Sequence, residues 1–314
     1  MQTSFTDLVG CRHPLQQAAM GGVSTPALAG AVAAAGALGM LCEFDDGSAA
    51  DRIATALSLA AGGTVGMGFF GHVIDGDLDT FELAAQQLRV VEVFWTAPDP
   101  ALVARARRAG PALVGWQVGS VGDAVAAEDV GCDFVVAQGV EAGGHVRGTT
   151  PREELLAQVL AAVSLPVVVA GGIATAQDVA DALASGAAAV RVGTRFVAAA
   201  ESGAHPDYIA ALVAARSGDE TVLTTAFGVG WPDAPHRVLA SALAAAEAFD
   251  GDVVGELTLT GGAVPLARFG VSPPSRQVEG HVEAMALYAG TGVGGVTGVC
   301  PAADVVSELV SALG

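Results

Sequence analysis

The residue with the clearest chemical potential is a histidine inside a glycine-rich segment. Residues 138–148 read Gln-Gly-Val-Glu-Ala-Gly-Gly-His-Val-Arg-Gly and directly follow an apolar run. Two adjacent glycines allow the backbone to lie close against a flat ligand, and the imidazole of His145 can accept a proton near neutral pH. The segment therefore predicts a binding loop that carries a general base. A surface loop with an incidental histidine is the alternative.

Two further glycine turns follow later apolar runs. Ala170-Gly171-Gly172-Ile173 precedes a helix start at Thr175, and Arg191-Val192-Gly193-Thr194 follows the next run. Backbone N–H groups in such turns bind phosphate well, because no side chain keeps the anion away from them. The pair of turns therefore predicts a phosphate site. The alternative is that the glycines serve only the geometry of tight turns.

These loops need a scaffold that brings them together, and the chain shows a regular alternation that can supply it. Eight short apolar runs alternate with helical stretches, at 15–20, 37–41, 64–70, 90–95, 112–118, 134–138, 166–170 and 188–192. Glycine-rich loops recur after several runs, which favours a closed (β/α)8 TIM barrel, of the α/β class, over an open doubly wound sheet. In a barrel all three loops lie at the carboxyl ends of the strands.

Helix ends carry their own signals. Thr25-Pro26, Asp99-Pro100, Thr150-Pro151 and the pair Thr175 and Asp178 predict helix starts, and Gly36, Gly110 and Gly186 predict left-handed C-caps.

The alternation ends after Phe196. Residues 204–281 hold a predicted helix at 238–249 and a strand-like stretch at 256–260 among many Gly and Pro residues. We expect a smaller unit there that covers the barrel mouth. Residues 282–313 predict two more helices joined by a glycine-rich loop at 290–298. The barrel domain is therefore expected to comprise residues 1–203 and 282–314.

Composition excludes several function classes. The 314 residues carry a formal charge of −19, which argues against nucleic-acid and anionic membrane partners. Every Lys+Arg residue is arginine, so a Schiff-base lysine and a Walker A lysine are absent. The four cysteines lack zinc-site or disulfide-scaffold spacing, and no metal site is expected. Without a signal segment or spanning run, the protein is expected in the cytoplasm. An alanine-rich surface makes a homodimer plausible.

The string Q-G-x-E-A-G-G-H-x-x-G, with A-G-G-I and G-T-R-F downstream, resembles the nitronate monooxygenase family of FMN-dependent barrel enzymes. Residues 16–26 and 36–39 also resemble the opening of that family. The resemblance covers most of the chain in the same order and spacing.

The resemblance implies FMN as cofactor and His145 as the base that removes the α proton of the substrate. It places Ala19, Met20, Gly21, Gln138 and Gly143 near the flavin ring and Gly172, Arg191, Val192, Gly193 and Thr194 at the phosphate, with Gly68, Gly144 and Gly171 as further contacts. It also implies a substrate-binding lid. His72 and Trp231 are candidate pocket residues, Trp95 and Trp116 are either pocket or core, and His13, His205, His236 and His281 are expected to be structural or exposed.

Two positions depart from the family pattern. Gly66-Met67-Gly68 stands where the family usually has asparagine, and Arg191 stands where it usually has glutamine. The guanidinium could pair with the phosphate and offset the lost amide. Alternatively, the changes mark a subfamily with another substrate.

The function that follows is oxidation of a small nitroalkane or its nitronate by molecular oxygen, which yields a carbonyl compound and nitrite. A flavin-dependent enoyl-acyl-carrier-protein reductase or an NADH:quinone reductase is the alternative within the same barrel. A barrel that binds FMN or a sugar phosphate without turnover is a third possibility.

Overall fold

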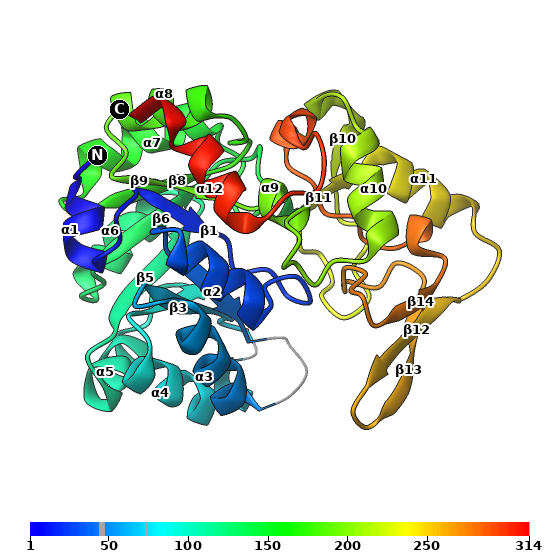
Figure 1. Cartoon of the computed structure of the whole chain (residues 1–314), viewed down its shortest axis with the longest axis horizontal. Coiled ribbons are helices and arrows are strands. Elements are labelled where there is room, and N and C mark those ends of the chain that lie inside the picture. The colour runs from blue at the N-terminus through cyan, green and yellow to red at the C-terminus, as the bar shows by residue number, and fades with distance from the viewer. Residues whose placement is uncertain (44–47, 73, 314) are drawn as a thin grey trace.

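A barrel lies beside a smaller lobe of helices and antiparallel strands (Figure 1). The computed structural model describes residues 1–43, 48–72 and 74–313. The eight-stranded sheet has the order β1-β9-β8-β6-β5-β4-β3-β2 with parallel pairing throughout. A parallel bridge between Gln16 and Leu38 joins the two end strands, so the sheet closes on itself. The predicted (β/α)8 TIM barrel is confirmed.

The barrel strands lie close to their predicted positions. They are β1 (Leu15–Gln17), β2 (Gly39–Cys42), β3 (Val65–Phe70), β4 (Val90–Phe94), β5 (Leu113–Val118), β6 (Phe134–Gln138), β8 (Val167–Ala170) and β9 (Ala189–Val192). Nearly all residues on both faces of these strands are buried, because helices cover the outside of the barrel and side chains fill its interior. Continuous apolar runs are therefore the correct signal for these strands.

Helices surround the barrel in chain order. They are α2 (Pro26–Ala34), α3 (Ala49–Leu59), α4 (Leu78–Gln87), α5 (Pro100–Ala109), α6 (Val121–Asp129), α7 (Arg152–Ala162) and α8 (Ala176–Ala184). The last position, between α8 and α2, belongs to α12 (Ala302–Leu309), whose apolar face joins the barrel core. The short helix α1 (Ser4–Val9) packs at the opposite end of the barrel from the mouth, where the Phe5 and Phe134 rings meet at 5.5 Å between centroids.

The second lobe comprises residues 206–295. Its elements are α10 (Pro206–Ala214), β10 (Thr221–Thr224), β11 (His236–Leu239), α11 (Ala240–Ala248), β12 (Val253–Leu259), β13 (Gly262–Ala267) and β14 (Val278–Gly280). Its hydrophobic cluster also includes Val23 and Val197 from the barrel side. The predicted domain boundaries at 204 and 281 stay a prediction.

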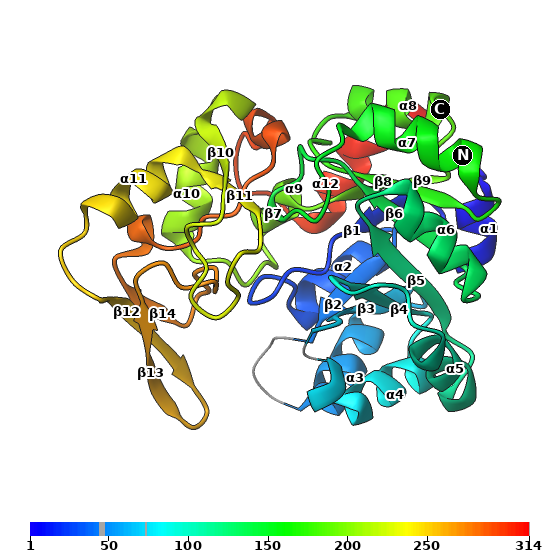
Figure 2. The ribbon, with the colours of Figure 1, turned by 180° about the vertical axis from the view of Figure 1, so that it is seen from behind.

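The two parts are joined by hydrogen bonds at the histidine loop. The two-residue strand β7 (Gly144–His145) pairs antiparallel with β11, which also pairs with β10 (Figure 2). His145 stands opposite His236 in this register. Strand β7, which carries the candidate base His145, is thus the edge strand of a sheet whose other two strands belong to the second lobe.

Several local predictions need correction. The helix predicted at 238–249 begins at Ala240, because Val238 and Leu239 belong to β11. Residues 282–289 form a 3-10 turn and an extended segment rather than a helix, since their apolar side chains are buried in the second lobe from several directions. In the described part of residues 282–313, α12 is the sole α-helix. The strand-like stretch at 256–260 is confirmed within β12.

Two predicted caps are also wrong. Gly110 has a φ of −173°, and it is glycine because a side chain there would meet the Ala85 carbonyl oxygen at 2.3 Å. Pro151 itself is the N-cap of α7, and Thr150 does not cap it. Thr25, Asp99 and Thr175 do cap their helices, and Thr175 forms a capping box with Asp178.

Candidate active site

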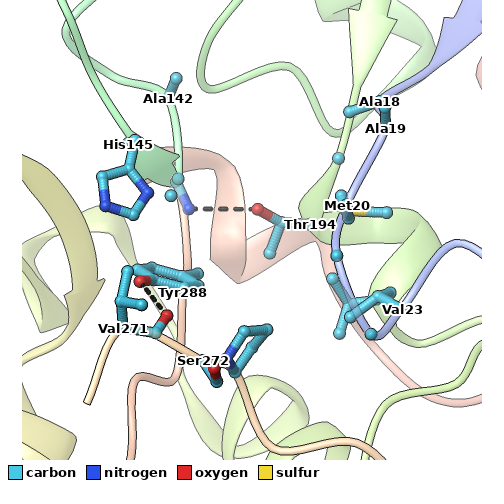
Figure 3. Close-up of a pocket in the computed structure, with 18 of the residues that line it drawn as sticks. Ala18, Ala19, Met20, Val23, Ala142, His145, Thr194, Val271, Ser272 and Tyr288 are labelled. Carbon is cyan, nitrogen blue, oxygen red and sulfur yellow. Dashed lines mark hydrogen bonds between the residues drawn. The ribbon is translucent and has the colours of Figure 1, made fainter. Parts of the chain in front are cut away.

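A cavity of about 490 Å³ opens at the carboxyl ends of the barrel strands, between the barrel and the second lobe. Figure 3 shows His145 and Tyr288 on one side of it and Ala18, Ala19 and Met20 on the other, with Thr194 between them. Predicted site residues that line this cavity are Ala19, Met20, Gly21, His72, Gln138, Gly143, Gly144, His145, Gly171, Gly172, Arg191, Gly193, Thr194 and Trp231. Gly68 and Val192 do not line it. The individual roles stay predictions.

His145 lies among aromatic rings. The Trp231 ring stacks on the imidazole with centroids 4.0 Å apart and planes 22° apart, while Trp95 and Tyr288 lie 5.7 Å and 5.6 Å away. Burial, together with the neighbouring His236 and His72, lowers the pKa of His145 to about 3. The imidazole is therefore neutral near pH 7. Its Nε2 atom is buried and has no hydrogen-bond partner.

His236 lies beside His145 as a buried structural residue, a neighbour that no local pattern in the sequence indicated. The two ring centroids are 5.3 Å apart. Nε2 of His236 accepts a hydrogen bond from the Phe227 N–H at 3.2 Å, so Nδ1 donates to the Ala234 carbonyl at 2.8 Å. Both ring nitrogens are occupied, and burial lowers the pKa of His236. His236 therefore stays neutral and holds the wall behind His145.

Trp231 connects the two histidines that line the cavity. The second imidazole, that of His72, has its centroid 4.0 Å from the centroid of the Trp231 indole. The Phe70 and Trp95 rings pack edge-to-face against the same indole, with centroids 5.3 Å and 4.9 Å from it. We call Phe70, His72, Trp95, His145 and Trp231 the aromatic wall. Trp116, in contrast, is buried in the barrel core.

The opposite side of the cavity is built from glycine backbone. Gly171 and Gly172 have φ values of 118° and 67°, in the left-handed region that favours glycine. A side chain at Gly172 would meet Thr291 Oγ1 at 2.7 Å, and one at Gly143 would meet the Gly290 nitrogen at 2.5 Å. Within the described residues, the N–H groups of Gly172 and Gly193 donate to no protein acceptor. These N–H groups fit an anion.

The segment Gly290–Gly292 was missed as part of the site by the sequence analysis. It lines the cavity, and the Gly290 N–H donates to Thr194 Oγ1 at 3.1 Å (Figure 3). The glycine-rich string at 290–298 was the available signal, but it was read as a connection between helices. We call Gly143, Gly171, Gly172, Gly193, Thr194 and the segment 290–292 the glycine wall.

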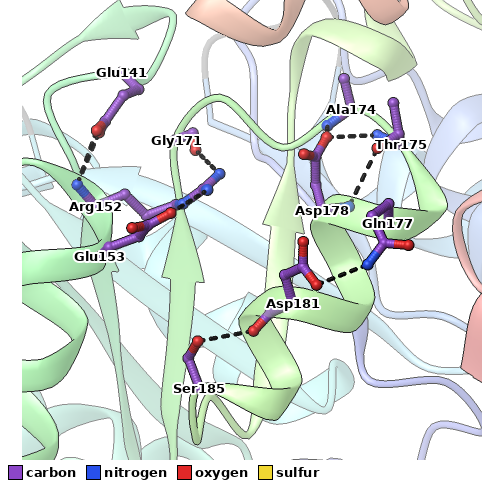
Figure 4. A network of polar contacts seen from close by, with 10 residues as sticks. All are labelled: Glu141, Arg152, Glu153, Gly171, Ala174, Thr175, Gln177, Asp178, Asp181 and Ser185. Carbon is purple, nitrogen blue, oxygen red and sulfur yellow. Dashed lines mark hydrogen bonds and ion pairs between the residues drawn. The ribbon is translucent and has the colours of Figure 1, made fainter.

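Glu141 fastens the glycine wall. Its carboxylate accepts the Arg152 N–H at 2.9 Å and 3.0 Å, which replaces the predicted cap of α7, and its carbonyl accepts the Thr291 N–H at 2.9 Å. Arg152 Nη1 in turn donates to the Gly171 carbonyl at 2.9 Å (Figure 4). Asp178 accepts from the Ala174 and Thr175 N–H groups in the same figure. The turn after β8 is thus held from both ends before any ligand binds.

The loop after β1 is positioned by buried side chains. Ser24 Oγ accepts from the Met20 N–H at 2.9 Å and from Gln17 Nε2 at 2.8 Å. Gly68 acts indirectly, because a side chain there would meet the Ala19 Cβ at 2.5 Å. The glycine that replaces the family's asparagine therefore leaves room for this loop, which explains why Gly68 does not line the cavity.

The Arg191 guanidinium has partners within the protein, and its predicted contact with a phosphate stays a prediction. The guanidinium is buried inside the barrel, where it forms an ion pair with Glu92 and hydrogen bonds with Gln117 and Gln16. Glu92 already supplies the countercharge that a buried guanidinium needs. A glutamate inside the apolar run at 90–94 was the signal for this partner.

Across the described ranges, no cluster of three or more His, Cys, Asp or Glu side chains could hold a metal ion. No helix in that part of the chain is long and apolar enough to span a membrane.

The fold and the site define an α/β barrel whose cavity combines glycine-rich turns with a buried imidazole. A family model described as "Nitronate monooxygenase" matches residues 2–65 and 81–312. The chain therefore belongs to the nitronate monooxygenase family of oxidoreductases, whose members are flavoproteins.

Characterised relatives carry two different activities in their names. A protein of Rhodococcus jostii strain RHA1, named (3aS,4S,5R,7aS)-5-hydroxy-7a-methyl-1-oxo-octahydro-1H-indene-4-carboxyl-CoA dehydrogenase, is 35% identical over 76% of this chain and 66% of its own length. The chain thus spans slightly less than two thirds of that relative. A nitronate monooxygenase of Pseudomonas aeruginosa is 33% identical over 78% of this chain and 83% of its own length.

Solved structures agree with the fold. The nitroalkane oxidase of Streptomyces ansochromogenes superposes with a TM-score of 0.76 at 30% identity and covers 98% of this chain and 97% of its own. FabK of Thermotoga maritima gives a TM-score of 0.76 at 25% identity, over 99% and 96% of the two chains.

The cavity fits a flavin nucleotide on features of this chain alone. Gln138 Oε1 is buried without a partner, while its Nε2 donates to the His145 carbonyl at 3.0 Å. A buried acceptor without a partner is costly unless a ligand donor reaches it, and a flavin ring carries such an N–H donor. The unoccupied N–H groups of Gly172 and Gly193 suit the other, anionic end of such a ligand.

Proposed function

We propose that this protein is an FMN-dependent oxidase of nitroalkanes and their nitronates that uses molecular oxygen and releases a carbonyl compound and nitrite. The observation that carries the proposal is the buried His145, whose side chain lines the same cavity as the glycine wall and whose Nε2 has no hydrogen-bond partner among the described residues. FMN, when bound, supplies the redox chemistry between the substrate and oxygen.

Gln138, Gly172, Gly193 and Thr194 are the residues that would hold FMN. The Gln138 amide oxygen would accept a hydrogen bond from the ring, and the backbone N–H groups of the two glycines would donate to the phosphate. The Thr194 hydroxyl accepts a hydrogen bond from the Gly290 N–H, which holds the segment 290–292 against the rest of the glycine wall. The proposal does not depend on a contact between Arg191 and the phosphate, because Glu92 already pairs with the guanidinium.

His145 accepts the α proton of a neutral nitroalkane at Nε2. The aromatic wall excludes water from the imidazole, so the ring is unprotonated and ready at neutral pH. A nitronate has already lost this proton and does not need the base. The substrate dependence of the histidine is therefore the distinguishing property of this mechanism.

A visible absorption spectrum of the purified protein and nitrite release assays test the proposal. We expect a yellow protein that releases nitrite from both nitroethane and ethyl nitronate. A colourless protein that FMN does not reconstitute would contradict it.

A flavin-dependent reductase is the second candidate. The relative named a CoA dehydrogenase has a redox activity on a substrate other than a nitronate, so activity among the relatives is not confined to nitronates. Anaerobic mixing with NADH separates the two candidates, because a reductase bleaches its flavin quickly and a nitronate monooxygenase stays yellow. Rapid bleaching together with no nitrite release would replace our proposal by the reductase.

A further inference from the structure

The cavity extends beyond the aromatic wall along a β-hairpin of the second lobe. Leu257 and Leu259 of β12 and Leu266 of β13 line the same cavity as His145. The antiparallel register pairs Gly255 with Leu266, Leu257 with Val264 and Leu259 with Gly262, so the leucines share one face of the hairpin. We call these three side chains the leucine row.

The opposite face of the hairpin has a different character. Glu256 and Thr258 alternate with the leucines along β12 and are exposed, whereas the leucines are half-buried. The leucine side chains that line the cavity indicate a surface that covers something apolar. Val278 of β14, Val271 and Pro273 continue the same lining.

Charge is absent from this part of the cavity. Among the described lining residues the only Arg, Asp or Glu is Arg191, which lies inside the barrel and pairs with Glu92. The polar groups near the row are the neutral side chains of Ser272, Ser275 and Gln277. A ligand that reaches the row therefore gains by burying hydrocarbon and finds no ion-pair partner there.

We propose that the leucine row is a subsite for an extended, uncharged hydrocarbon part of the substrate, such as a long straight alkyl chain. The assignment of the reacting carbon near His145 rests on the proposed function, but the subsite itself rests on the hairpin. A longer substrate can contact both His145 and the row, so longer substrates should be preferred.

A chain-length series tests the subsite. We expect kcat/KM to rise from nitroethane through nitrobutane and nitrohexane to nitrooctane, by about fourfold for each methylene that is buried. In the double variant Leu257→Ser, Leu259→Ser, the ratio of kcat/KM for nitrooctane to that for nitroethane should fall at least about tenfold. Glu256→Gln, on the opposite face of the hairpin, is the matched control and should keep the wild-type ratio.

A binding measurement keeps the test independent of turnover. The dissociation constants of butanol, hexanol and octanol, measured through tryptophan fluorescence, should fall with chain length in the wild type and the control but not in the double variant. A chain-length effect on binding without nitrite release would leave the subsite standing and overturn the proposed function. A flat series, or a rise that survives in a double variant with wild-type thermal stability, would overturn the subsite.

Discussion

The two walls of the cavity are built in opposite ways. The glycine wall is built from closely approaching backbone: a side chain at Gly143 is excluded by the Gly290 backbone, and one at Gly172 would meet the side-chain oxygen of Thr291. The aromatic wall is side chain against side chain, with the centroids of contacting rings 4.0 Å to 6.0 Å apart. A backbone wall has a fixed shape that suits an invariant cofactor. A side-chain wall can change residue by residue, and so can select substrates while the fold stays constant.

The largest expected effect concerns the base on the aromatic wall. His145→Gln should lower kcat/KM for nitroethane by about 10²- to 10⁴-fold, because general-base assistance is lost, and should affect ethyl nitronate far less. Nitrite release with both substrates measures the difference. His281→Gln, which changes an exposed histidine, is the control. Equal losses on both substrates would exclude the base role.

The glycine wall should be intolerant of a single methyl group. Gly172→Ala should weaken FMN binding by about 10- to 100-fold, because the added carbon displaces Thr291 and strains a left-handed backbone. Gly62→Ala is the matched control, since Gly62 has a φ of 83° and no neighbouring atom within 4 Å. Titration of apoprotein with FMN gives both affinities. Equal affinities in the two variants would mean that this wall does not hold the cofactor.

Trp231 should control the protonation of His145. Burial is the first cause of the lowered pKa, and the stacked indole provides part of that burial. Trp231→Ala should therefore raise the pKa of His145 from about 3 toward its ordinary value of 6.5. Titration of the imidazole by proton NMR measures the change, with the exposed His281 as reference in the same spectrum. An unchanged pKa would show that other groups keep water out.

The smallest effect is on stability. Because the folded-state pKa of His145 is lowered, the unfolded chain binds the proton first, and stability falls as pH falls from 6.5 toward 3. The loss is at most about 1.4 kcal/mol per pH unit. The difference in unfolding free energy between His145→Gln and wild type should therefore move in favour of the variant between pH 7 and pH 5. Denaturant titrations at the two pH values measure this, and a constant difference would contradict the burial of the imidazole.

The sequence predicted the barrel well because its signals are local. Each strand is a buried apolar run, and caps such as Thr25 and Thr175 act within one helical turn. The same holds for the His145 loop and the turns at Gly172 and Gly193, which carry their glycines with them.

The features that the sequence did not predict come from contacts between distant parts of the chain. Arg191 forms an ion pair with Glu92, which lies 99 positions away in the sequence. Strand β7 pairs with β11 of the second lobe. Residues 282–289 have a helix-like composition, yet they are buried from several sides and stay extended. Gly290 lies at the cavity because of tertiary packing: the glycine-rich string at 290–298 indicates a loop, but not that this loop contacts Thr194.

The pairing of β7 with β11 has a consequence for how this enzyme can diversify. The strand that presents the imidazole is half of a ladder whose other half comes from the lobe that carries the leucine row. Replacement of residues 206–295 by those of a relative would therefore change the substrate preference. The same replacement would change the position of the His145 imidazole in the cavity, because β11 pairs with the strand that carries it. On the proposed function, substrate choice and proton abstraction would be inherited together.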